Sequence, residues 1–118
     1  MFRDARGEII DLVEQEPFDS ASLITTVAGA VRGNHYHLDT YQVTYVLSGR
    51  LRVVTQMPDA PVVTRIAEAG DLVRTRPSES HAVQSLTDST MLVLTRGPRG
   101  GRNYESDTHR LTEPLIPD

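Results

Sequence analysis

Three of the chain's four histidines, His35, His37 and His81, are the residues whose type and spacing could do chemistry. His35 and His37 are two positions apart, so a β-strand would place both imidazoles on one face, roughly 7 Å apart along the strand. A neutral imidazole offers a nitrogen lone pair that binds transition metals or accepts a proton near neutral pH. We therefore predict that the three rings bind one divalent transition metal per chain, with Zn, Fe, Ni, Mn, Co and Cu as candidate ions.

Gln42 follows the histidine pair after a short polar stretch that can turn the chain. The strand that begins there can return its amide beside the two imidazoles, so we take Gln42 as the fourth metal ligand or as a side chain that orients the ligands. Three neutral imidazoles and a neutral amide leave the charge of a divalent ion uncompensated. Such a site would favour anionic ligands such as carboxylates or enediolates. His109, alone in the tail, is expected at the surface.

The elements that must position these residues are short strands. Apolar runs alternate with breaks rich in Gly, Pro, Asp and Ser, which supply the backbone angles that turns need. The predicted strands are Ser22–Val27, Ala30–His37, Gln42–Leu47, Leu51–Thr55, Val62–Ile66, Leu72–Arg76, His81–Leu86 and Met91–Thr95. Ile9–Glu14 is compatible with a strand or with one helical turn. The pattern predicts an all-β fold, an antiparallel sandwich or closed barrel.

The length of 118 residues is typical of a single domain. We place its core at about residues 22–96, an N-terminal arm at 1–21 and a C-terminal tail at 97–118. The tail is rich in Gly and Pro, so we expect an extended segment that wraps over the barrel or reaches a neighbour. Because an arm at each terminus could pair across subunits, we expect a homodimer.

Composition excludes several classes of function. A net charge of −4 with scattered arginines argues against a nucleic-acid partner, because binding phosphates takes clustered cations. The absence of cysteine excludes disulfides, thiolate metal sites and thiol nucleophiles. No apolar run is long enough to span a membrane, and the N-terminus lacks the apolar core of a signal peptide. We therefore expect a cytoplasmic protein that binds a small molecule.

The histidine spacing resembles that of the cupin superfamily. The stretch from Gly29 through His35, His37 and Gln42 to Gly49 is similar to the first cupin motif, with Gln42 where the family usually has a ligating Glu. The stretch from Gly70 to His81 is similar to the second motif, in which the metal-binding His lies at the same distance from the Gly. The resemblance implies a jelly-roll (double-stranded β-helix) barrel with His35, His37, Gln42 and His81 at the metal.

A narrower resemblance concerns cupins of nucleotide-sugar metabolism. Phe2–Glu8, the segment Arg32-Gly-Asn-His-Tyr-His37 and Gln42 look like TDP-4-keto-6-deoxyglucose 3,4-ketoisomerases, which work without metal. That resemblance implies that His35 or His37 is the base and that Arg32 contacts the diphosphate. An imidazole is suited to abstract a proton next to a ketone.

These features support three hypotheses of function. The first is a metal-dependent enzyme, of isomerase, epimerase or dioxygenase type, on a small oxygenated metabolite such as a sugar or keto acid. The second is a metal-free nucleotide-sugar ketoisomerase that uses His35 and His37 as catalytic proton-transfer groups. The third is a non-catalytic module that binds a small ligand. Candidate substrate contacts are Arg32, Tyr36 and Tyr45.

Overall fold

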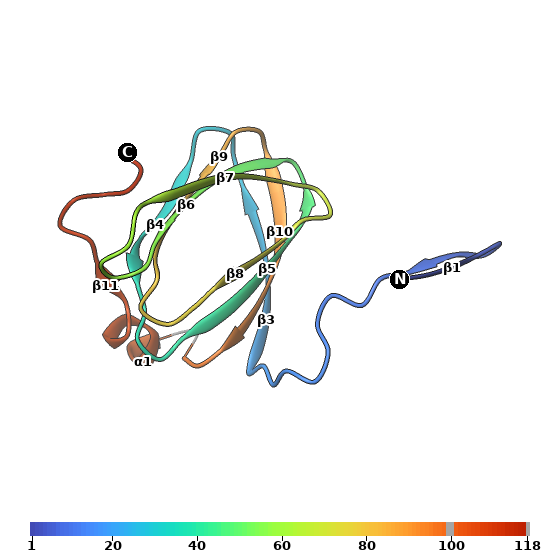
Figure 1. Ribbon diagram of the computed structural model, residues 1–118, viewed down its shortest axis with the longest axis horizontal. Coiled ribbons are helices and arrows are strands. Elements are labelled where there is room, and N and C mark those ends of the chain that lie inside the picture. The colour runs from blue at the N-terminus through green and yellow to red at the C-terminus, as the bar shows by residue number, and fades with distance from the viewer. Residues whose placement is uncertain (99–100, 118) are drawn as a thin grey trace.

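The structure is a computed structural model that describes residues 1–98 and 101–117 (Figure 1). Its strands are β1 (Phe2–Asp4), β2 (Gly7–Ile9), β3 (Ser20–Thr26), β4 (Val31–Tyr36), β5 (Tyr41–Ser48), β6 (Arg50–Gln56), β7 (Val63–Glu68), β8 (Leu72–Thr75), β9 (Ser80–Ser85), β10 (Ser89–Arg96) and β11 (His109–Arg110). The helix α1 spans Gly101–Ser106. The prediction of an all-β fold is confirmed.

Two antiparallel sheets form the barrel. One has the strand order β3-β10-β5-β8 and the other β11-β4-β9-β6-β7, while β1 and β2 form a separate hairpin. Each predicted core strand matches one of β3 to β10, with ends that differ by a few residues. The strands formed where apolar and β-branched residues alternate with polar ones, because that period of two gives each strand one buried face.

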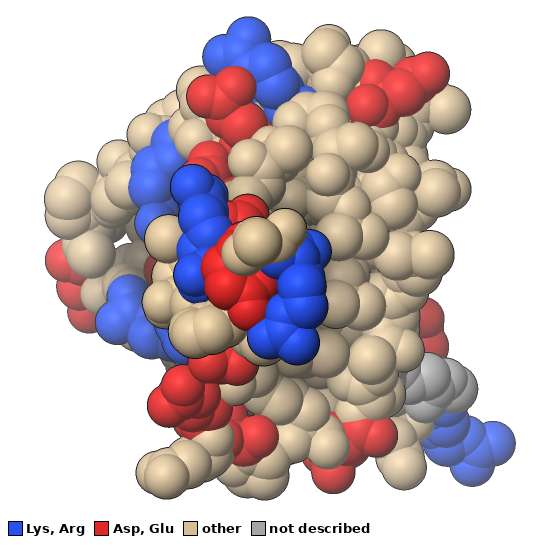
Figure 2. All heavy atoms as spheres, turned by 90° about the vertical axis from the view of Figure 1, so that its right-hand side faces the viewer, with Lys and Arg blue, Asp and Glu red and all other residues tan. Residues whose placement is uncertain are grey.

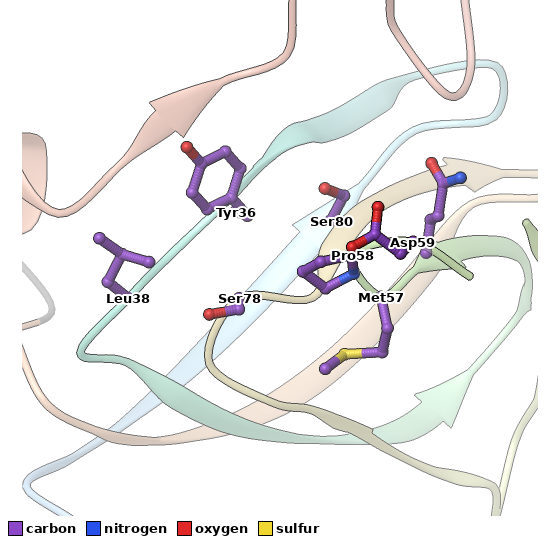
Figure 3. A pocket seen from close by; sticks show the side chains of 8 residues that line it. Tyr36, Leu38, Met57, Pro58, Asp59, Ser78 and Ser80 are labelled. Atoms are coloured by element: carbon purple, nitrogen blue, oxygen red, sulfur yellow. The ribbon is translucent and has the colours of Figure 1, made fainter. Parts of the chain in front are cut away.

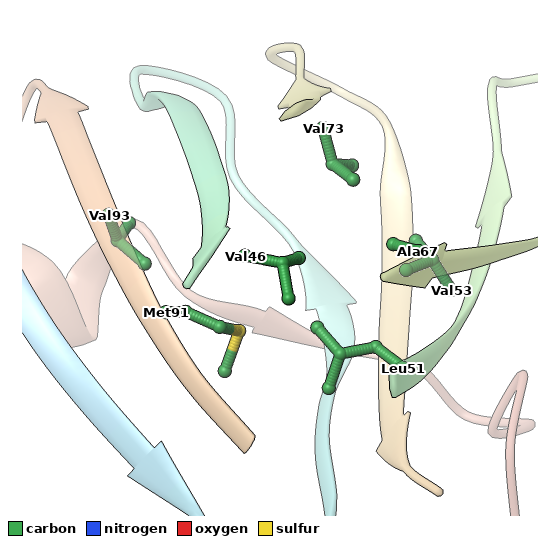
Figure 4. Packing of buried hydrophobic residues seen from close by; sticks show 7 residues of the cluster. All are labelled: Val46, Leu51, Val53, Ala67, Val73, Met91 and Val93. Atoms are coloured by element: carbon green, nitrogen blue, oxygen red, sulfur yellow. The ribbon is translucent and has the colours of Figure 1, made fainter. Parts of the chain in front are cut away.

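The core lies between the two sheets. Its buried residues come from strands of both sheets, which shows that the sheets close on one another (Figure 4): Val46, Leu51, Val53, Ala67, Val73, Met91 and Val93. Leu51 is among the largest fully buried side chains. Burying such apolar surface supplies the main stabilising free energy of the barrel.

The C-terminal segment wraps over the barrel, and it contains a helix that the sequence did not predict. After α1, the short strand β11 pairs with β4. Further on, the side chain of Ile116 is buried against Val54 and Ala82, on the sheet face opposite the core. Asn34 holds this stretch, because its side-chain amide donates to the Ile116 carbonyl at 2.8 Å and its Oδ1 accepts from the Ile116 N–H at 3.1 Å.

The hairpin β1–β2 extends away from the barrel (Figure 1). The region Ile9–Glu14, which fitted a strand or a helical turn, contains the end of β2 and otherwise no regular structure. Phe2 and Ile9 are cross-strand partners and are 55% and 60% exposed, so the apolar pair is uncovered. Figure 2 views the molecule from the side of the hairpin. Next to the charged side chains at the centre of that view lies a broad surface with few charged side chains. Within the described residues, no helix is long and apolar enough to cross a membrane.

Candidate functional site

Strand β9, strand β4 and the residue that follows β4 bring three histidines together. His35 and His81 are direct cross-strand partners, and His37 follows His35 on the same face of the sheet. Ring centroids are 4.7 Å apart for His35 and His37, 4.7 Å for His35 and His81, and 5.4 Å for His37 and His81. One ligand nitrogen from each ring lies within 4.8 Å of the other two. The structure thus groups the three histidines that the sequence singled out.

A β-bulge in β4 sets this alignment. The pairing with β9 shifts between Gly33 and His35, where Gly33 and Asn34 have φ values of 91° and 58°. A side chain at Gly33 would be strained in this left-handed conformation, and its Cβ would lie 2.8 Å from the His81 carbonyl oxygen. Glycine therefore lets β4 approach β9 closely, and the bulge turns His35 toward His81.

Two of the three rings have a defined tautomer. The Nδ1 atom of His37 lies 3.0 Å from the carbonyl oxygen of Asp107, and Nδ1 of His81 lies 3.1 Å from that of Glu79. A carbonyl oxygen can only accept, so both Nδ1 atoms carry the proton and both Nε2 atoms keep a lone pair. The Nε2 atom of His37 is buried and has no hydrogen-bond partner among the residues described.

Burial keeps His35 and His81 neutral. It lowers the pKa of His35 to about 3, with further lowering by His81, His37 and Arg110. It also lowers the pKa of His81 to about 4, although the hydrogen bond to the Glu79 carbonyl partly opposes this. Below neutral pH these rings therefore stay uncharged over a wide range, and a neutral ring is the form that binds metals or accepts protons.

His35 and His81 border a cavity between the two sheets. It has a volume of about 260 Å³, and its polar lining comes from Arg32, His35, Gln42, Thr44, Thr75, His81 and Tyr104. The core side chains described above form much of the remaining wall. Gln42 shares this cavity, and its Nε2 donates to Thr95 Oγ1 at 3.4 Å.

Two of the predicted substrate contacts lie elsewhere. Tyr36 lies on the opposite face of β4 from His35, stacked on His109 with ring centroids 5.0 Å apart. It lines a separate groove of about 350 Å³ that the loop Met57–Asp59 also borders (Figure 3). Tyr45 is on the outer face of β5, as the cross-strand partner of Leu92. The structure therefore brings Arg32, but neither tyrosine, to the histidines.

The C-terminal segment adds three residues that the sequence analysis missed. The ring of Tyr104, on α1, lies 5.4 Å from that of His37. Asp107 binds His37 through its carbonyl oxygen, as described above. Arg110 is the cross-strand partner of His35, so its side chain emerges on the same face. No motif marks these positions, because only the pairing of β11 with β4 brings them to the site.

The donor set fits a divalent transition metal. Imidazole nitrogens with a free lone pair are ligands that Zn, Cu, Fe and Ni prefer, and the carbonyls that accept from Nδ1 of His37 and His81 are typical partners of metal-bound histidine. Gln42 lies on the wall of the same cavity. An ion bound there would polarise a carbonyl oxygen as a Lewis acid.

Residues 2–108 match the protein family described as "Polysaccharide biosynthesis C-terminal domain". The chain belongs to this family. It is also 26% identical over 103 residues to the oxalate decarboxylase OxdC of Bacillus subtilis (strain 168), an alignment that covers 70% of this chain but 27% of that protein. The chain thus spans about a quarter of the length of this curated relative.

Three solved structures illustrate the fold. The rmlC epimerase of Mycobacterium tuberculosis has a TM-score of 0.75 at 15% identity, over 92% of this chain and 64% of that one. QdtA, a sugar 3,4-ketoisomerase from Thermoanaerobacterium thermosaccharolyticum in complex with TDP, has a TM-score of 0.69 at 22% identity, over 94% of this chain and 82% of that one. The capsular polysaccharide assembling protein CapF of Staphylococcus aureus has a TM-score of 0.69 at 15% identity, over 88% of this chain and 33% of that one. At these identities the likeness concerns the fold, and the predicted cupin fold is confirmed.

Proposed function

We propose that this cupin domain isomerises or epimerises a keto sugar carried on a nucleoside diphosphate, with His35 as the proton-transfer group. The main support is that His35, open to the cavity, has Arg32 and Arg110 on its own face of the sheet. A base beside two cations suits a substrate with an acidic C–H group and a diphosphate. The similar structures include a ketoisomerase in complex with TDP and an epimerase, which agrees with this proposal.

The reaction needs only proton transfer. The carbon next to the ketone gives its proton to the free nitrogen of His35, and the C–H electrons move to form an enolate or enediolate. The proton then returns to a different carbon in an isomerisation, or to the other face of the same carbon in an epimerisation. Atoms and electrons balance without an oxidant or reductant. His35 suits the first step because it is neutral, and therefore has a lone pair to accept the proton.

The two arginines provide an anion site next to this base. Arg32 lines both the cavity and a neighbouring groove of about 440 Å³, and Arg110 lines the same groove. Neither guanidinium forms an ion pair with an acidic side chain among the described residues. A diphosphate between them would offset the positive charge of Arg110, which is one of the causes that lower the pKa of His35. Substrate binding would therefore make His35 a stronger base.

Exchange with heavy water tests the proposal. The purified chain is incubated in D₂O with a TDP-linked 4-keto-6-deoxy sugar, and deuterium next to the carbonyl is followed by mass spectrometry and NMR. We expect incorporation with the wild-type chain, and a loss of about 100-fold or more in His35→Asn. His109→Asn is the matched control, because that ring stacks on Tyr36 on the other face of the sheet. Equal exchange in His35→Asn and wild type would refute the role of His35.

A second candidate is the metal-dependent form of the same class of enzyme. It is favoured by the convergence of the three imidazoles and by the buried Nε2 of His37, which has no partner among the described residues. We propose that His35, His37 and His81 would hold one divalent transition ion, with Gln42 as fourth ligand or orienting side chain. Elemental analysis of the purified chain should then give about one metal per chain, lost in His81→Asn. A metal-free chain that still catalyses deuterium exchange would exclude the metal-dependent mechanism and support the metal-independent one.

A further inference from the structure

Asp107 joins the C-terminal segment to the loop that follows the histidine pair. It comes directly after α1, and it is 6% exposed. Its Oδ1 accepts from the Leu38 N–H at 3.0 Å and the Asp39 N–H at 3.1 Å, while its Oδ2 accepts from Thr40 Oγ1 at 2.7 Å. One buried carboxylate thus satisfies three donors of the loop between β4 and β5.

The carbonyl of the same residue holds His37. This oxygen accepts the Nδ1 proton of the ring at 3.0 Å, and the ring is 2% exposed. The carboxylate bonds fix where Asp107 sits relative to Leu38, which is the next residue after His37. The position of the carbonyl relative to the imidazole is therefore set by the carboxylate of its own residue.

This arrangement decides which nitrogen of His37 carries the proton. With the carbonyl in place, a proton on Nε2 would leave Nδ1 facing an oxygen without a hydrogen between them, and two acceptors at 3.0 Å repel each other. The Nδ1–H form is therefore strongly preferred, and the Nε2 lone pair is available on the side of the other two histidines. If the carbonyl moves away, this preference disappears.

We infer that Asp107 is a positioning residue, which fixes the ring orientation and the Nδ1–H tautomer of His37 and so makes the C-terminal segment part of the reaction centre. Its importance for turnover rests on the proposed function. Its effect on His37 does not, and it is measured directly on the protein without substrate or metal.

The test uses the full chain labelled with ¹⁵N-histidine and treated with a chelator. Long-range ¹H–¹⁵N spectra at pH 7 report which ring nitrogen is protonated, and His37 is assigned by comparison with His37→Asn. We expect the Nδ1–H form in the wild type and a shift toward the Nε2–H form in Asp107→Ala. Asp107→Asn should shift less, because its amide oxygen can still accept from the Leu38 and Asp39 N–H groups. Asp39→Asn is the control, because that neighbouring carboxylate is exposed and accepts none of the loop's hydrogen bonds. Its spectrum should match the wild type.

Two results would overturn the inference: an Nε2–H form of His37 in the wild type, or unchanged His37 signals in a folded Asp107→Ala variant. Should this variant not fold, Thr40→Val removes one donor to the carboxylate and keeps the rest. A partial shift of the His37 signals then supports the inference, and unchanged signals overturn it.

Deuterium exchange in the same variants separates the two proposals. We expect a loss of about 10- to 100-fold in exchange rate when Asp107 is replaced, the range found for residues that orient site histidines. If the wild type shows no exchange activity but the Asp107 variants still change the tautomer of His37, the positioning role is supported and the proposed function is refuted. Activity that persists at full rate despite a tautomer shift would show that His37 has no part in the reaction.

Discussion

The burial of His81 should make the folded chain sensitive to mild acid. The residue is 8% exposed, and burial lowers its pKa to about 4, against about 6.5 in an unfolded chain. Between these two values the unfolded state binds a proton that the folded state does not bind. The free energy of unfolding therefore falls as the pH decreases from about 6.5 to about 4, and His81 causes no further loss below that.

The size of this effect follows from the gap between the two pKa values. The two pKa values of His81 differ by about 2.5 units, and each unit corresponds to about 1.4 kcal/mol. His81 alone therefore lowers the free energy of unfolding by about 3 kcal/mol. This is a large part of the stability of a small domain, which is typically about 5–15 kcal/mol. His35 acts with the same sign, but its partial exposure lets solvent screen the effect.

Urea unfolding of the chelator-treated chain at pH 7.5 and pH 4.5 measures the effect, with His81→Asn as the comparison. The amide of asparagine can replace Nδ1 as donor to the Glu79 carbonyl, and it does not titrate. The carboxylates are the same in both chains. Their contribution therefore cancels when the loss of unfolding free energy in the variant is subtracted from that in the wild type. We expect the wild type to lose about 2–3 kcal/mol more than the variant. Equal losses within about 0.5 kcal/mol would refute the reasoning, because His81 would then have an ordinary pKa in the folded state.

Three further outcomes are expected. Gln42→Glu should tighten binding of a divalent metal and weaken binding of anions, because a carboxylate offsets part of the ion's charge; unchanged anion affinity in calorimetry would contradict this. Leu51→Ala should cost about 2–5 kcal/mol in urea unfolding, since the side chain is 1% exposed, and a cost below about 1 kcal/mol would show that the core can collapse around it. The expected homodimer should depend on the hairpin, whose exposed pair Phe2 and Ile9 would be covered by a second copy. Light scattering should therefore give a dimer for the full chain and a monomer without residues 1–10, and a monomeric full chain would exclude the dimer.

The barrel and the shared face of His35 and His37 were accessible to sequence analysis because both depend on local periodicity. Alternation along Gln42–Leu47 reports the two faces of β5, and the spacing of His35 and His37 guarantees a shared face once that segment is a strand. His81 could be proposed because the stretch from Gly70 to His81 resembles the second cupin motif, and the structure makes it the direct cross-strand partner of His35. The bulge at Gly33 leaves no comparable pattern, since a single glycine is compatible with many turns.

The contribution of the C-terminal segment could not be predicted, because it rests on contacts between residues far apart in the sequence. Asp107 is one acidic residue in a polar tail, and nothing local shows that its carboxylate will bind a loop nearly seventy positions earlier. Tyr36 was expected beside the site histidines, but the structure has it on the other face of β4 for a different reason. Its position between two site histidines drew attention to it, but the same alternation that unites His35 and His37 directs the residue between them to the opposite face.

The same side chains suit both metal binding and proton transfer, so the histidines alone do not determine the chemistry. Both roles need neutral rings with an available lone pair, and burial and backbone carbonyls provide this for His81. What differs is the charge around the rings. Gln42 adds no negative charge that would hold a cation, and Arg32 and Arg110 add positive charge beside His35. These two features favour an anionic ligand at the site over a bare cation. The balance between the two proposed functions therefore depends on Gln42 and the arginine pair, and Gln42→Glu combined with Arg110→Gln should shift it toward metal retention.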